Sequence, residues 1–169
     1  MTRRLTRDAL LTALALIIFV VEAQIPPLVP IPGIKLGLAN IITLYALFSL
    51  GPVDALGILI VRIFLGSVFA GSFSAILFSL SGGLLCYAVS LLLRRILTRK
   101  QIWVCGMMGA AAHNLGQLAA AMLLYHTGSL LLYLPVLLFS GGITGLFTGL
   151  AAQLTLGRLE QGRSGKGKE

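Results

Sequence analysis

Residues 32–47 read PGIKLGLANIITLYAL and form the most informative stretch of the chain. It places Lys35 and Asn40 at the head of a mostly apolar run. Four prolines in residues 25–32 (IPPLVPIP) come just before it, so a stiff loop leads into a hydrophobic helix that carries a charge. Ionisable groups inside a membrane segment are expensive and mark binding sites or ion paths. We therefore expect a membrane segment that begins at a binding site.

The rest of the chain has the composition of an integral membrane protein. Its 169 residues are 57% hydrophobic and 11% charged, with a mean hydropathy of +0.98. A soluble domain carries about 25% charged residues. The apolar runs are long and do not alternate as barrel strands do, and at about 20 residues per span the length permits about six crossings. This predicts an all-α bundle of six transmembrane helices.

Breakers between the apolar runs set the limits of the expected spans. The predicted spans cover residues 8–23, 34–50, 53–70, 73–96, 102–125 and 130–156. Residues 1–157 would form one membrane domain, and residues 158–169 a basic, disordered cytoplasmic tail.

The basic residues predict the orientation and account for the net charge of +8 without nucleic acid. They gather before the first span, between the fourth and fifth spans and after the sixth: Arg3, Arg4, Arg7, Arg94, Arg95, Arg99, Lys100, Arg158, Arg163, Lys166 and Lys168. With six spans, all three clusters lie on one side, which the positive-inside rule makes cytoplasmic. Both termini are then expected in the cytoplasm.

Four ionisable residues lie within or at the edges of the spans. Asp54 is explained by its place at a helix N-terminus, where acidic groups are favoured. Arg62 lies midway along a span and keeps its charge. Two interpretations remain open for it and for Lys35: contact with an anionic ligand, or a structural role in which Glu22 pairs with Arg62 or with Lys35.

The fifth span carries His113, Asn114 and Gln117 on neighbouring positions of one helix. These side chains predict either a hydrogen-bond clamp between helices or part of a pocket. Neutral amides and an imidazole suit recognition better than catalysis. Asn40 could face the same space.

Small residues suggest close helix contacts in two places. Ala9 and Ala13 form a small-xxx-small pair in the first span, and Gly141, Gly145 and Gly149 form a stripe in the sixth. Packing within the chain is the simpler interpretation of both, but a partner helix, including a second copy through the glycine stripe, stays open.

Sequence signatures of an enzyme are missing. The chain has five acidic residues and no DDxxD-like motif for magnesium, and it has no P-loop for ATP. Cys86 and Cys105 are isolated in apolar segments and have no metal-ligand spacing. We expect no catalytic residue, metal site or cofactor, so the energy for any transport would come from a partner.

Residues 32–47 resemble the hallmark of the Gx transporter family of bacterial membrane proteins, which is also called heptaprenyl diphosphate synthase component I. This resemblance implies a place in the inner membrane of a bacterium. The six-span plan is also similar to the S components of energy-coupling-factor vitamin transporters. This second resemblance implies that Ala9 and Ala13 dock on a coupling subunit and that residues 25–35 form a loop over the ligand. It also implies ligand contacts from the fifth span near Asn114 and Gln117.

These observations predict a substrate-binding transport protein that captures a small anionic molecule, vitamin-like or a prenyl diphosphate, from the outer face. By the resemblance, ATPase and coupling subunits would energise it. The expected binding residues are Lys35, Asn40, Arg62, His113, Asn114 and Gln117. One alternative is a non-catalytic membrane subunit of isoprenoid, heptaprenyl diphosphate or quinone metabolism. The other is a membrane anchor of a redox complex, in which hydrogen bonds seal the polar residues of the fifth span.

Overall fold

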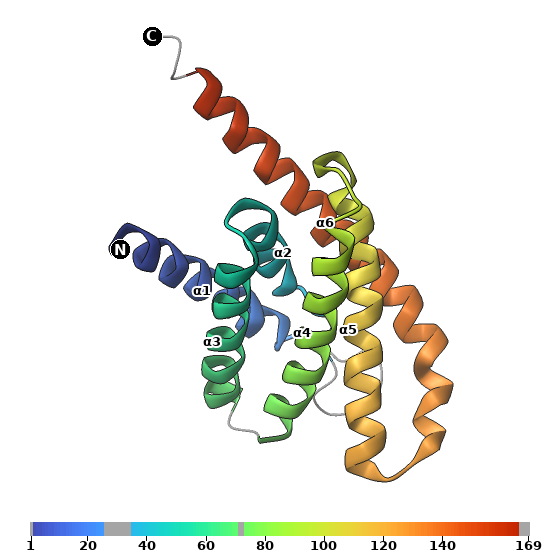
Figure 1. The fold of residues 1–169 in the computed structure, drawn as a ribbon. Coiled ribbons are helices and arrows are strands. Elements are labelled where there is room, and N and C mark those ends of the chain that lie inside the picture. Colours follow the sequence, from blue (N-terminus) through green and yellow to red (C-terminus); the bar gives the residue numbers. More distant parts are fainter. Residues whose placement is uncertain (1, 26–34, 71–72, 166–169) are drawn as a thin grey trace.

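The computed structural model describes residues 2–25, 35–70 and 73–165, and these residues form α-helices and short 3-10 helices without any β-strand (Figure 1). Along the chain the elements are α1 (Thr2–Glu22), α2 (Asn40–Ser49), α3 (Pro52–Ala70), α4 (Phe73–Leu93), η1 (Arg99–Gln101), α5 (Ile102–Tyr125), η2 (Gly128–Tyr133) and α6 (Leu134–Gly165). The prediction of an all-α bundle is confirmed. The predicted proline loop falls largely outside the described residues.

Three helical stretches of the described residues are long and apolar enough to cross a membrane: Pro52–Phe69, Ser74–Leu93 and Gly128–Leu159. The chain is therefore membrane-associated. Two further helices have sufficient length, at 21 residues for α1 and 24 for α5. Charged residues such as Asp8 and Glu22 interrupt the apolar character of α1, and the polar residues His113, Asn114 and Gln117 lower the hydropathy of α5.

Helix α2 is shorter than the predicted span at residues 34–50, because it begins at Asn40. Gly37 has a φ of +79°, a conformation that cannot continue a right-handed helix. A turn follows in which the Asn40 N–H donates to the Gly37 carbonyl at 3.0 Å. Ten residues of helix measure about 15 Å, half the hydrocarbon core of a bilayer. Lys35 therefore lies before the helix rather than on it.

The helices pack as two neighbouring groups. Helix α5 packs closely against both α4 and α6, while α3 contacts both α1 and α2, and α2 also contacts α6. The connection through η1 lies toward the top of Figure 1 and the connection through η2 at the bottom, while α1 begins at the left of the view and α6 ends at the upper left.

The glycine stripe of α6 packs against α5 of the same chain. A Cβ atom at Gly106 would lie 2.7 Å from the Gly149 Cα, and one at Gly145 would lie 2.7 Å from the Met107 Cα. Such distances leave no room for a side chain, so the glycines let the two backbones approach closely. The stripe therefore packs against α5 of the same chain, which is the simpler of the two interpretations.

Helix α6 continues to Gly165, through part of the segment predicted as a tail. Once a helix exists, each added residue gains one hydrogen bond at little further cost, so a polar sequence can extend it. The last residues of the predicted tail, 166–169, lie outside the described residues.

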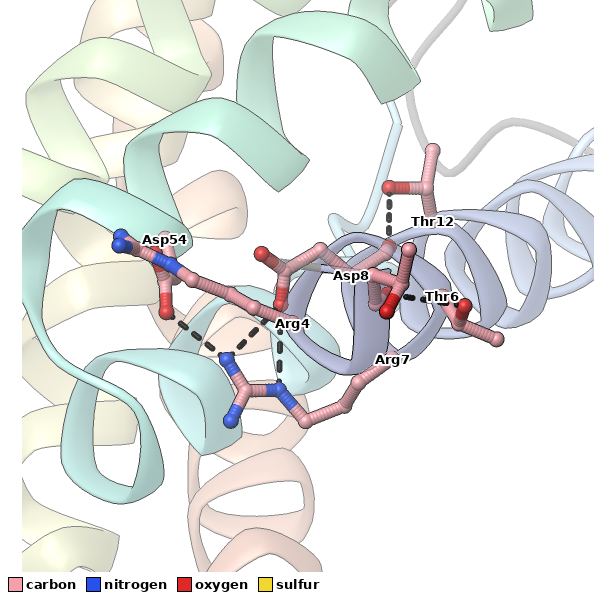
Figure 2. A network of polar contacts seen from close by, with 7 residues as sticks. Arg4, Thr6, Arg7, Asp8, Thr12 and Asp54 are labelled. Atoms are coloured by element: carbon pink, nitrogen blue, oxygen red, sulfur yellow. Dashed lines mark hydrogen bonds and ion pairs between the residues drawn. The ribbon is translucent and has the colours of Figure 1, made fainter.

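An ion-pair network joins the start of α1 to the start of α3 (Figure 2). The Nε of Arg4 donates to Asp54 Oδ1 at 2.8 Å, and the Nη2 of Arg7 donates to Asp54 Oδ2 at 2.9 Å. Arg7 also pairs with Asp8. Asp54 is at the helix N-terminus, as the sequence predicts, but its two arginine partners were not anticipated. The arginines are largely exposed, so solvent screens these pairs and they add little to the stability of the fold.

Candidate functional site

A chain of polar side chains crosses the bundle from α3 through α2 to α5. The Nη2 of Arg62 donates to the Oδ1 of Asn40 at 3.2 Å. The Nδ2 of Asn40 lies 3.1 Å from the Nδ1 of His113. Arg62 and His113 are both buried, each only 4% exposed. The structure therefore brings three of the predicted site residues, from three separate helices, into direct contact.

The segment before α2 lies against this row of polar side chains, and hydrogen bonds join it to both α5 and α1. The Lys35 N–H donates to Gln117 Oε1 on α5 at 3.3 Å, and the Gly37 N–H donates to Glu22 Oε1 at the end of α1 at 2.6 Å. A Cβ at Gly37 would lie 2.9 Å from the Cδ2 of His113 and 3.1 Å from its Nε2. Glycine is required here both for its positive φ and for this close approach.

We call Glu22, Lys35, Asn40, Arg62, His113 and Gln117 together the polar cluster. Sequence analysis missed the Glu22 contact with Gly37, because a bond from a side chain to a backbone N–H leaves no residue pattern. It also missed Thr43, one helical turn after Asn40, whose buried hydroxyl lacks a partner in the described part of the chain. A threonine within an apolar helix was the available signal for that residue.

The charges of the polar cluster are not paired with one another in the described residues. There, the ion pairs with N–O distances up to 4.0 Å join Arg4 and Arg7 to Asp54 and Asp8. Neither of the expected pairs of Glu22 occurs among them. The ammonium of Lys35 instead lies 3.6 Å from the centre of the Phe19 ring, a cation–π contact. With Lys35 and Arg62 protonated and Glu22 ionised, the polar cluster has a net charge of +1.

Several buried polar atoms of this region lack a hydrogen-bond partner. Within residues 2–25, 35–70 and 73–165, these include Arg62 Nε, His113 Nε2, Asn114 Oδ1 and Thr43 Oγ1. Leaving one such group unsatisfied costs roughly 1–3 kcal/mol, so native proteins rarely do so without a reason. Their concentration around one part of the bundle indicates a place where a ligand or water completes the bonding.

Asn114 faces a different neighbour from His113. Its Nδ2 donates to the carbonyl of Leu137, where α6 begins, and it lies against Gly141. The side chain thus works as a clamp between α5 and α6, the alternative left open by the sequence. Its Oδ1 is the atom that remains for a ligand. Asn114 is not part of the polar cluster.

A small internal cavity adjoins the polar cluster, with a volume of about 20 Å³. This is room for about one water molecule. Gly37 and Asn40 line it together with Thr43, Ser90 and Thr148. In the described residues this cavity has no room for more than a water molecule, so a larger ligand would need more space than it offers.

The alanine pair of α1 lies on the outer surface of the bundle. Ala9 and Ala13 are exposed, whereas Thr12, Ala15 and Phe19 on the other face are buried. The two cysteines are free and buried, and the described residues contain no group of three potential metal ligands.

Comparison with known proteins gives one match. A protein-family model described as heptaprenyl diphosphate synthase component I matches residues 11–155. This range contains every residue of the polar cluster. No curated protein and no solved structure matches the chain.

Proposed function

The chain belongs to the heptaprenyl diphosphate synthase component I family, and from this premise we propose that it binds a small anionic solute at the polar cluster for transport. The observation that carries the proposal is the state of Arg62. This guanidinium is buried, its Nε has no partner in the described residues, and no carboxylate there pairs with it.

A buried arginine that makes no direct ion pair is costly, because it cannot lose its proton to escape the charge. The surplus positive charge of the polar cluster can be neutralised by a carboxylate or a phosphate of the solute. Charged hydrogen bonds of this kind are shorter and stronger than neutral ones. The unpartnered atoms of the cluster support a ligand more than the redox anchor, which requires sealed hydrogen bonds.

The direction of capture follows from the proposed orientation. With the N-terminus in the cytoplasm of a bacterial cell, α1 leads to the outer face, and the segment at Lys35–Gly37 returns from it. The solute would enter from this side and displace contacts such as the one between the Lys35 N–H and Gln117.

Transport also needs an energy source, which we assign to a partner complex of ATPase and coupling subunits. The chain has no P-loop of its own. Ala9 and Ala13 form an exposed surface of small residues on α1, where a partner helix can approach closely. Their position resembles that of the docking motif of S components.

The family description favours a second candidate, a membrane subunit that binds a prenyl diphosphate. The same cations would hold the diphosphate. An apolar groove of about 490 Å³ between α4 and α5, lined by Leu77, Leu84, Leu85 and Leu123 among others, has the character needed for the hydrocarbon tail.

Native mass spectrometry of the protein in a mild detergent tests these candidates, with Arg62→Gln beside Arg95→Gln as a matched control on an exposed arginine. A bound anionic solute that disappears in the first variant alone supports capture. A prenyl diphosphate with the same dependence supports the second candidate. A ligand-free protein that copurifies with a redox subunit would contradict both and favour the anchor.

A further inference from the structure

The direction of each hydrogen bond around Asn40 can be assigned from the chemistry of its partners. A guanidinium only donates, so the Asn40 atom that faces Arg62 Nη2 at 3.2 Å is the carbonyl oxygen, Oδ1. The other end of the amide is then the NH₂ group, Nδ2, which also donates. It faces His113 Nδ1 at 3.1 Å.

This assignment decides the tautomer of His113. A ring nitrogen that accepts a hydrogen bond carries no proton, so Nδ1 is unprotonated and the imidazole is neutral. The single ring proton is then on Nε2. The Nε2 atom is buried against Gly37 and has no hydrogen-bond partner in the described part of the chain.

The backbone of Gly82 offers the competing arrangement. A Cβ at Gly82 would lie 2.9 Å from His113 Nδ1, so α4 also lies close to this nitrogen. Were Nδ1 to carry the proton, as a bond to the Gly82 backbone requires, the NH₂ group of Asn40 would face an N–H. Two donors 3.1 Å apart repel one another, which disfavours this tautomer.

We propose that Asn40 is a positioning residue that holds His113 as the Nε2–H tautomer, so that the polar cluster offers N–H donors to a ligand group that only accepts hydrogen bonds. This inference rests on the proposed function for the existence of the ligand. It specifies the substrate class as an oxyanion, a carboxylate or a fully ionised phosphate oxygen, and disfavours amides and alcohols that must also donate.

Nitrogen-15 NMR of histidine-labelled protein tests the tautomer directly. The chain has two histidines, and His126 is exposed at the end of α5, so His126→Asn leaves His113 as the single signal. We expect an unprotonated Nδ1 and a protonated Nε2. A protonated Nδ1 in this protein would overturn the proposal, whether or not any variant folds.

Asn40→Asp then tests the cause, because a carboxylate of the same shape cannot donate to Nδ1. We expect Nδ1 to become protonated in this variant. An unchanged Nδ1 in a folded variant would show that Asn40 does not position the ring, and would contradict the proposal.

Titration separates this inference from the proposed function. Inorganic phosphate, added to protein in a phosphate-free maltoside detergent, should shift the Nε2–H proton resonance, and acetamide should not. A short-chain phosphatidylglycerol that shifts the resonance where phosphate does not would assign the oxyanion to a lipid headgroup. An Nε2–H tautomer that no anion perturbs would contradict the proposed function and the ligand half of this inference, while the role of Asn40 on the ring would stand.

Discussion

The side chain of Arg62 on α3 donates its Nη2–H to the Oδ1 of Asn40, the first residue of α2, at 3.2 Å. This bond links the longer helix to a helix of ten residues that cannot cross a bilayer alone. The Nε of the same guanidinium has no hydrogen-bond partner in the described residues. The bond therefore holds the start of α2 in place and keeps one charged donor available for a ligand.

Replacing Arg62 should weaken anion binding more than it weakens the fold. In Arg62→Gln the amide can still donate to Asn40, but the charge and the free Nε–H are lost. A hydrogen bond to a charged group contributes about 1.5–3 kcal/mol, so we expect the dissociation constant of the copurified anion to rise about 10- to 100-fold. Isothermal titration calorimetry measures it, and an equal loss in Arg95→Gln would contradict the assignment.

Gly37→Ala should destabilise the protein and impair binding together. A Cβ would lie 2.9 Å from Asn40 Nδ2 and from His113 Cδ2, and the φ of +79° is unfavourable for alanine. We expect a loss of about 1–3 kcal/mol in the free energy of unfolding, measured in detergent by chemical denaturation.

Gly142→Ala is the matched control for that change, because a Cβ at Gly142 meets nothing within 4 Å. Alanine is favoured over glycine inside a helix, so this variant should be as stable as the unmodified protein or more stable by up to about 1 kcal/mol. Similar losses in both variants would show that the turn at Gly37 has no special role.

The glycine stripe provides a third prediction, which separates packing within the chain from dimer formation. In Gly145→Ala the new methyl group would lie 2.7 Å from the Met107 Cα and 2.8 Å from the Ala110 Cβ. We expect lower stability, by about 1–3 kcal/mol, with no change of oligomeric state in native mass spectrometry. A stable variant that changes from dimer to monomer would contradict the intramolecular contact.

The elements of this bundle were more predictable than the site. Long apolar runs predict helices because their length and hydrophobic pattern can be recognised in the sequence itself. The bounds of α5 agree with the span expected at residues 102–125. The start of α2 was not predictable, since a glycine in an apolar run reads as helix until its positive φ is known. Arg62, Asn40 and His113 were each identified as candidates, but no spacing rule places three separate helices in contact.

The different roles of His113 and Asn114 show the same limit. The two residues are adjacent on α5, and the sequence treats them as one polar face. In the structure His113 contacts α2, whereas Asn114 donates to the Leu137 carbonyl in the first turn of α6. Neighbouring helix positions point about 100° apart, so which of them meets which helix depends on the packing of the whole bundle.

A fourth prediction uses that difference. Asn114→Ala removes a donor from a buried carbonyl, so we expect a loss of roughly 1–3 kcal/mol in the free energy of unfolding. Lys35→Ala removes a half-buried cation whose ammonium contacts Phe19, and should mainly weaken anion binding, with little effect on unfolding. Thermal unfolding and calorimetry of both variants, side by side, check the pair; the reverse pattern would exchange the two roles.

The surface of α1 supports the last prediction. Ala9 and Ala13 are exposed, so a larger side chain at either position meets no atom of the chain's own core. Ala9→Leu and Ala13→Leu should therefore fold and bind the anion normally, but lose assembly with an energising partner, because small residues are what permit close helix approach. Ala119→Leu, at an exposed position of α5, is the matched control and should assemble normally. Affinity purification of the tagged protein from its native membrane, with anion binding measured on the same sample, distinguishes the cases: a partner retained by both α1 variants would show that this face contacts lipid rather than protein.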